Sequence, residues 1–276
     1  MYSGEWTLIV FSLLTQCAVG IWLVAMILRA AIAKRTDQST AYRLTRQSVI
    51  VVGPLISIAL VTSIFHLGSP MLAYGSIANL GTSWLSREIV SSGLFLFLWI
   101  ICYYVNYRKE SAGKVLVALT SLLGILAVFS MASIYYYTPI PAWSTVRTYL
   151  SFFATALILG SLASALLLSY ASRKSELKPE LRKLVGKLAI TALAAAILQL
   201  LFSPVLEEVY RTPLLIQRLL LAVGAVTFAV YWQRLSQKPE QKVNHWVIST
   251  YFGLIVAGEV LGRYLFYTGA NTLPIF

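Results

Sequence analysis

The residues best suited to acid–base chemistry lie at the two ends of one segment. His66 and Glu88 enclose it. Between His66 and Arg87 the segment has no formal charge and is rich in Gly, Ser and Pro. Histidine accepts and donates protons near neutral pH, and a carboxylate takes up a proton. The pair therefore predicts proton transfer. The structural alternatives are a histidine bonded to the backbone and an acid favoured by a helix N-terminus, with Arg87 neutralising it.

A second acid–base pair lies near the end of the sequence. Glu259 and Arg263 stand at positions i and i+4, which places them on one face of a helix with the acid in the favourable N-terminal position. They predict either a structural ion pair or the polar end of a binding pocket. Gln16 and Gln199 lie in apolar surroundings, and we expect them to form hydrogen bonds between helices.

The composition shows which elements must position these side chains. The 276 residues are 58% hydrophobic and 12% charged, whereas a soluble domain has roughly 25% charged residues. The apolar residues fall in blocks of about 20, enough to cross a bilayer as a helix. We therefore predict an all-α integral membrane protein, a single transmembrane anchor domain over residues 1–276 with about eight helices. The predicted spans are Trp6–Ala30, Gln47–His66, Ile89–Tyr107, Val115–Tyr136, Tyr149–Tyr170, Leu188–Leu206, Pro213–Trp232 and His245–Tyr267.

The basic residues predict the orientation of these spans. Most of the 22 Lys and Arg residues, Arg29 included, lie at or after the ends of the first, third, fifth and seventh spans. The basic side of a membrane protein is cytoplasmic, so both termini and the segment between His66 and Glu88 are expected outside. That segment is expected to be a partly buried connector, because irregular backbone at membrane depth must be shielded or line a cavity. The net charge of +12 thus reflects orientation, and no nucleic-acid partner is expected. The other side has Arg87, Arg147, Arg211, Arg218 and Arg263.

Aromatic and sulfur-containing residues add little chemistry to this picture. Tyr135, with its neighbours in the 135–137 tyrosine run, is expected at the membrane interface as an anchor. Cys17 and Cys102 lie in apolar blocks and are expected to pack there, and an iron–sulfur cluster usually needs four cysteines. His66 and His245 are predicted on opposite faces, which disfavours haem b. No metal site is therefore predicted in this protein.

Several short elements resemble the membrane-anchor subunit of the dimethyl sulfoxide reductase complex, the DmsC family. They occur in matching order along nearly the whole sequence, and the combination of the His-Leu-Gly-Ser-Pro and Gly-Glu-x-x-Gly-Arg elements is the most specific part. One departure is Leu72, where an arginine commonly follows the Ser-Pro-Met element. The elements are Trp6–Phe11 with Gln16–Cys17, His66–Pro70, Leu85–Ile89, Pro141–Trp143, and Gly258–Arg263 with Phe266–Tyr267.

The resemblance implies a definite role. Such anchors have eight spans with both termini outside, and they hold an iron–sulfur subunit and a molybdopterin catalytic subunit at the bacterial cytoplasmic (inner) membrane. They oxidise menaquinol and pass its electrons to the iron–sulfur subunit, with no haem, iron–sulfur cluster or molybdenum of their own. The resemblance ties His66, Gly68 and Glu88 to quinol binding. The remaining candidates for the quinol pocket are Ser69, Pro70, Arg87, Glu259 and Arg263.

Three other functions are compatible with a polytopic membrane protein. A solute or ion transporter typically has broken helices and charges at mid-membrane, but here the charges lie toward the outer ends of the spans. A polysulfide reductase-type anchor also reacts with quinones, with different motifs around its acid-Gly-Arg-Pro region. A scaffold that only tethers its partners would keep quinol-linked turnover after His66 is replaced. The terminal electron acceptor is chosen by the catalytic subunit and is not encoded in this sequence.

Overall fold

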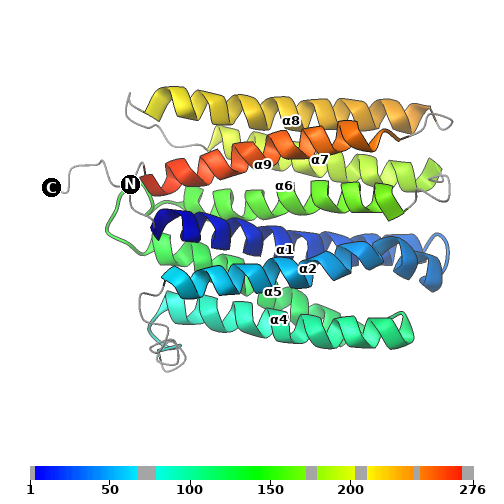
Figure 1. Ribbon diagram of the computed structural model, residues 1–276, viewed down its shortest axis with the longest axis horizontal. Coiled ribbons are helices and arrows are strands. Elements are labelled where there is room, and N and C mark those ends of the chain that lie inside the picture. Colours follow the sequence, from blue (N-terminus) through cyan, green and yellow to red (C-terminus); the bar gives the residue numbers. More distant parts are fainter. Residues whose placement is uncertain (1–3, 67–78, 172–178, 203–209, 239–242, 269–276) are drawn as a thin grey trace.

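The computed structural model describes residues 4–66, 79–171, 179–202, 210–238 and 243–268. In these segments eight long helices lie side by side in one bundle (Figure 1). All eight are long and apolar enough to cross a membrane, so the protein is a multi-pass membrane protein. The helices are α1 (Gly4–Ala33), α2 (Gln38–His66), α4 (Trp84–Lys109), α5 (Lys114–Tyr136), α6 (Val146–Ala171), α7 (Pro179–Leu201), α8 (Arg211–Gln237) and α9 (His245–Thr268).

Each predicted span corresponds to one of these helices, and the largest differences are at two helix starts. Helix α2 begins at Gln38 instead of Gln47, and α7 begins at Pro179 instead of Leu188. Polar and basic residues fill these extra turns, so hydropathy does not detect them, although the helical hydrogen bonds continue past the apolar zone. The predicted end of the sixth span, Leu206, lies outside the described residues.

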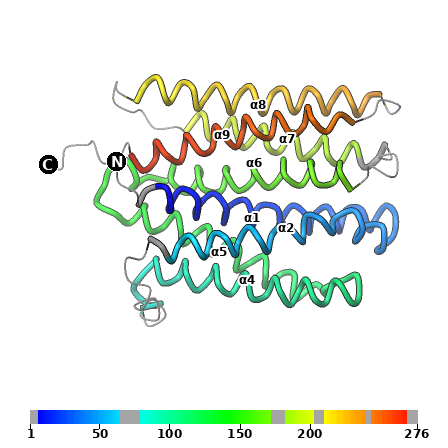
Figure 2. Tube along the Cα trace, in the orientation of Figure 1, coloured from blue at the N-terminus to red at the C-terminus, as the bar shows by residue number. Residues whose placement is uncertain are grey.

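Helix α1 is the most enclosed element of the bundle. In its most apolar stretch 72% of the residues are buried, and it packs against α2, α5, α6 and α9. Figure 2 shows α1 in the middle of the trace, with α4 and α8 at opposite edges. The apolar side chains of the outer helices, such as Phe97 and Leu219, are more than half exposed, as expected of surfaces that face lipid.

Two glycines bring α1 and α6 into close contact. A Cβ atom on Gly20 would overlap the backbone carbonyl of Ala156, and a Cβ atom on Gly160 would overlap the backbone of Gly20. Small residues permit such close backbone approach, and they commonly mediate the association of membrane helices. This crossing sets the position of α6, including Thr155, relative to α1.

The variant Gly20→Ala is expected to lower the free energy of unfolding by about 1–3 kcal/mol, because its methyl group must push α1 away from the Ala156 carbonyl. A denaturant titration of the protein in detergent measures this value. Gly93→Ala in α4 is the matched control, since a Cβ atom there meets nothing within 4 Å. We expect it to be neutral or to stabilise the helix by up to about 1 kcal/mol. Equal losses in both variants would contradict the close crossing.

A capping aspartate explains the early start of α2. The backbone N–H of Thr40 donates to Asp37 Oδ1 at 2.8 Å, and the Thr40 hydroxyl donates to Asp37 Oδ2 at 2.7 Å. The backbone N–H of Ala41 donates to the Asp37 carbonyl at 3.1 Å. These are the contacts of a helix N-cap. The hydrogen bond from the Thr40 backbone is the largest cause that lowers the pKa of Asp37 below its usual value.

Acid pH is therefore expected to loosen the first turn of α2. Because its folded pKa is depressed, Asp37 stabilises this turn above the pKa of the unfolded state, and the contribution is lost as the pH falls through the folded pKa. The protection factor of the Thr40 amide, measured by hydrogen exchange at neutral and acid pH, checks this expectation. Asp37→Asn caps the helix without titrating, so its protection is expected to change less with pH. The same acid-induced loss in both proteins would refute the assignment.

A buried arginine ties three helices together at the end of the bundle where α1 ends and α2 begins. Arg29 donates to the Thr45 hydroxyl at 2.8 Å and to Asn106 Oδ1 at 2.6 Å, and it is only 7% exposed. Sequence reasoning groups Arg29 with the basic loop residues, but the structure places it inside the bundle between α1, α2 and α4. Its acceptors are neutral, so a guanidinium is held there by hydrogen bonds to uncharged groups.

Candidate functional site

Glu88 lies in the second turn of α4 and is buried. The helix begins at Trp84, after an N-cap at Ser83 whose hydroxyl accepts a hydrogen bond from the Ser86 backbone N–H at 3.3 Å. The predicted span begins at Ile89, with Glu88 at its edge. Because Ser83 caps the helix, α4 begins earlier, at Trp84. Glu88 is only 4% exposed, which attraction to the helix N-terminus does not explain. A buried ionisable group in a membrane span is a candidate for function.

Arg87 holds the turn that leads into α4. Its guanidinium donates to the carbonyls of Leu80 at 2.9 Å and Gly81 at 2.8 Å. It also lies over the Trp84 ring, 4.1 Å from the ring centroid, where a cation–π contact is favourable. These contacts position the start of α4, and with it the Glu88 side chain.

A buried polar network surrounds Glu259 in α9. Its Oε2 atom accepts hydrogen bonds from the Thr155 hydroxyl of α6 at 2.8 Å and from the side-chain amide of Gln199 of α7 at 3.4 Å. Its Oε1 atom is buried and has no hydrogen-bond partner among the described residues. Glu259 thus joins α9 to α6 and α7 through Oε2. Within the described residues, its Oε1 atom is left to accept a hydrogen bond from a further donor.

Arg263, one turn further along α9, extends the network to α1. Its guanidinium donates to Gln16 Oε1 at 2.8 Å and to the Thr155 hydroxyl at 3.5 Å, and lies 3.9 Å from the centroid of the Phe152 ring. Because the Thr155 hydroxyl also donates to Glu259, it bridges the predicted acid–base pair. The predicted placement of both charges on one helix face is confirmed, and the face points into the bundle.

Both glutamines form the predicted hydrogen bonds between helices. Gln16 of α1 accepts from Arg263 and donates through Nε2 to the sulfur of Met131 in α5 at 3.5 Å. Gln199 of α7 donates to Glu259 in α9. Five helices therefore meet at this network, and its members hold the bundle together on one side of the close α1–α6 crossing.

Two tyrosines lie near both the network and Glu88. The Tyr135 hydroxyl of α5 donates to the Tyr267 hydroxyl of α9 at 3.2 Å. Both phenols lie within electrostatic range of the Glu88 and Arg263 side chains. Glu88 and the Glu259–Arg263 pair, far apart in the sequence, therefore belong to one polar region of the folded protein.

Sequence reasoning misses Thr155 and assigns the wrong role to Tyr135. Tyr135 points into the bundle, where its ring packs against those of Trp143 and Phe152 at centroid distances of 5.1 and 5.8 Å. Successive helical residues point about 100° apart, so a run of tyrosines cannot share one environment. Tyr137, 64% exposed, is the member of the run that suits the expected interfacial anchor. A lone hydroxyl within the apolar block around Thr155 was the available signal for a buried contact.

Part of the predicted site lies outside the described residues. Helix α2 ends at His66, and α9 begins at His245 at the opposite end of the bundle (Figure 1), as the predicted spans require. The predicted connector between His66 and Glu88 is described only from Asn79 onward. The undescribed members of the predicted site are the His66 side chain, Gly68, Ser69 and Pro70, together with the departure at Leu72.

The fold and this polar region define a multi-pass membrane protein with ionisable side chains buried among its helices. The sequence matches the family model described as DMSO reductase anchor subunit (DmsC) over residues 1–269. The protein therefore belongs to the DMSO reductase anchor subunit family.

Curated relatives have names that agree with this family. The sequence is 28% identical to the YnfH subunit of an anaerobic dimethyl sulfoxide reductase of Escherichia coli over 276 residues, 95% of this sequence and 94% of the relative. It is 28% identical to the C subunit of the anaerobic dimethyl sulfoxide reductase of the same organism over 282 residues, 97% of this sequence and 96% of the relative. With the corresponding C subunit of Haemophilus influenzae it shares 32% identity over 179 residues, 63% of this sequence and 62% of the relative.

Proposed function

We propose that this protein anchors a dimethyl sulfoxide reductase-type complex to the bacterial cytoplasmic membrane and oxidises menaquinol for it. An iron–sulfur partner subunit receives the electrons, and a molybdopterin catalytic subunit uses them to reduce the terminal acceptor. The observation that carries the proposal is the buried carboxylate of Glu88, which an anchor without redox chemistry does not need. Family membership favours this function over a transporter or a polysulfide reductase-type anchor.

The proposed reaction accounts for the protons and the electrons that the quinol releases. Oxidation of one quinol to a quinone releases two protons and two electrons. Glu88 and His66 are the proposed proton acceptors, because a positioned carboxylate and imidazole are suited to general-base catalysis. The electrons pass to the iron–sulfur partner. Arg87 positions the start of α4, and the remaining proposed residues of the quinol pocket are Gly68, Ser69, Pro70, Glu259 and Arg263.

The distribution of charge supports an orientation for this chemistry. Gly4 and Thr268, the first and last described residues, lie at the same end of the bundle as the start of α4 (Figure 1). The ends of the helices at the other side carry basic residues such as Arg35 and Lys109, and basic loops face the cytoplasm. In this orientation Glu88 lies toward the outside. Protons and electrons then leave the quinol on the same face, and the step builds no membrane potential.

A reconstituted complex in oriented liposomes tests this function. On addition of a menaquinol analogue, we expect electron paramagnetic resonance to show reduction of the partner's iron–sulfur clusters. We expect a potential-sensitive dye to show no sizeable membrane potential. If the clusters stay oxidised although the anchor is bound, the protein only tethers its partners and does not oxidise quinol. A sizeable quinol-driven membrane potential would overturn the proposed orientation.

A further inference from the structure

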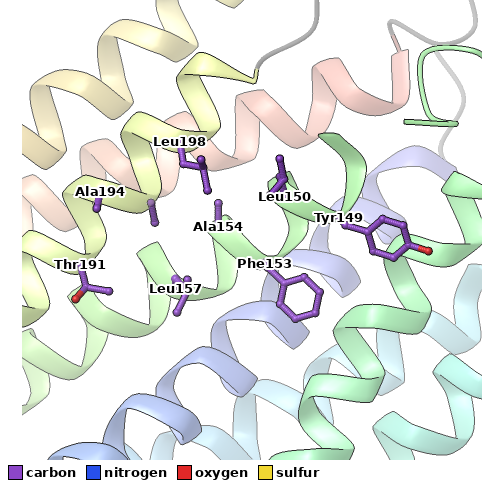
Figure 3. A pocket seen from close by; sticks show the side chains of 9 residues that line it. Tyr149, Leu150, Phe153, Ala154, Leu157, Thr191, Ala194 and Leu198 are labelled. Atoms are coloured by element: carbon purple, nitrogen blue, oxygen red, sulfur yellow. The ribbon is translucent and has the colours of Figure 1, made fainter. Parts of the chain in front are cut away.

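An apolar groove runs between α6 and α7 on the surface of the bundle (Figure 3). Its volume is about 490 Å³, within the range of sites that bind small molecules. The small side chains of Ala154 and Ala194 leave room for it, and Leu157 and Leu198 form part of its walls. Both leucines are more than a third exposed, so the groove is open to the side from which lipid approaches.

Two members of the buried polar network are sequence neighbours of residues that line the groove. Thr155 and Gln199 immediately follow Ala154 and Leu198 in the sequence, and both donate hydrogen bonds to the buried Glu259 carboxylate. Along α6 and α7, apolar residues that line the groove therefore alternate with residues of the network around Glu259. This adjacency distinguishes the groove from ordinary lipid-facing surface.

An aromatic strip joins the groove to the start of α4. Tyr149, which lines the groove, stacks on Phe129 of α5 at 5.1 Å between ring centroids. Phe129 contacts Trp84 at 5.7 Å, and Trp84 carries the Arg87 guanidinium. Phe129 is 38% exposed, so the strip is accessible from the membrane. The rings of Trp84, Phe129 and Tyr149 thus form a series of contacts from the first turn of α4 to the groove.

We propose that the α6–α7 groove binds the isoprenoid tail of the quinol whose head group is oxidised near Glu88. This inference rests on the proposed function and adds a location for the apolar part of the substrate. The strip of Trp84, Phe129 and Tyr149 connects the two parts of the site. The groove holds the tail through burial of hydrocarbon, which is non-directional, so it selects for the presence of a tail and not for a particular quinone ring.

Filling the groove tests the proposal. In the purified complex, KM is measured for a menaquinol with several isoprene units and for a tail-less naphthoquinol. Ala194→Phe places a ring in the groove from an exposed position. We expect the KM of the tailed menaquinol, divided by the KM of the tail-less naphthoquinol, to rise about tenfold, because part of the tail is no longer buried. Ile197→Phe is the matched control, because Ile197 lies in the same helix, is 48% exposed and does not line the groove. Its ratio is expected to match that of the unmodified complex.

The outcomes separate the tail site from the function on which it rests. If the unmodified complex oxidises both quinols and Ala194→Phe leaves the KM ratio unchanged, the groove does not bind the tail. If Ala194→Phe raises both KM values equally, the groove is occupied by a structural lipid or serves packing, and the proposal is again overturned. If the unmodified complex oxidises neither quinol, the proposed quinol oxidation itself is wrong.

Discussion

Replacing Glu259 with leucine is expected to lower the free energy of unfolding by about 3–5 kcal/mol, because it leaves a buried guanidinium without its compensating carboxylate. Arg263 is only 3% exposed, so its guanidinium is shielded from water. The Thr155 and Gln199 side chains also lose their shared acceptor. Thermal or denaturant unfolding of the protein in detergent measures the effect.

A double-mutant cycle separates the charge effect from the loss of packing. Glu259→Leu combined with Arg263→Met removes both charges and replaces them with side chains of similar length. We expect the double variant to recover a substantial part of the lost stability, since an apolar replacement of a buried pair is often neutral or stabilising. If the two single losses simply add, the residues do not act as a pair across Thr155. A conservative Glu259→Gln variant retains an acceptor oxygen for Thr155. Its free energy of unfolding is expected to lie between those of the unmodified protein and Glu259→Leu.

The spans were predictable because one physical requirement dominates them. A helix that crosses lipid must remain apolar for about 20 residues, and that signal survives without knowledge of any contact. The starts of α2 and α7 were not predictable from hydropathy, because Gln38 and Pro179 begin helical turns that lie in polar sequence. The Asp37 cap was a readable signal for α2, since an acid followed by Thr40 at N3 offers an acceptor to the first turn.

The polar region was predictable in its charges and not in its connections. Glu259 and Arg263 could be placed on one face from their spacing, and the high cost of charge in a membrane indicates that the face points inward. Spacing within one helix cannot show which residue of another helix stands opposite. Thr155 and Tyr135 therefore appear only in the folded bundle, as does the neighbourhood that joins Glu88 to Tyr267. Contacts between distant segments are set by helix packing, for which Gly20 and Gly160 were only weak signals.

Glu88→Gln is expected to reduce quinol-linked turnover of the assembled complex by about 10²- to 10⁴-fold, the usual contribution of a general base. The amide is nearly isosteric with the carboxylate, so α4 and its Ser83 cap are expected to remain intact. Reduction of the partner's iron–sulfur clusters by a menaquinol analogue, followed in a stopped-flow experiment, measures the change. His66→Ala tests the second proposed acceptor in the same assay.

Two controls decide whether such a loss reports on proton transfer. Glu110→Gln changes an exposed acid at the other end of α4, and we expect its quinol-linked turnover to equal that of the unmodified complex. Turnover driven by a soluble dye that reduces the partner subunits directly is expected to survive in Glu88→Gln, because it bypasses the anchor. Full quinol-linked turnover in Glu88→Gln would remove the carboxylate from the reaction and leave it a structural part of the region shared with Tyr135 and Tyr267. If Glu88→Gln loses the quinol-driven turnover and keeps the dye-driven turnover, the step that it has removed is proton acceptance by Glu88.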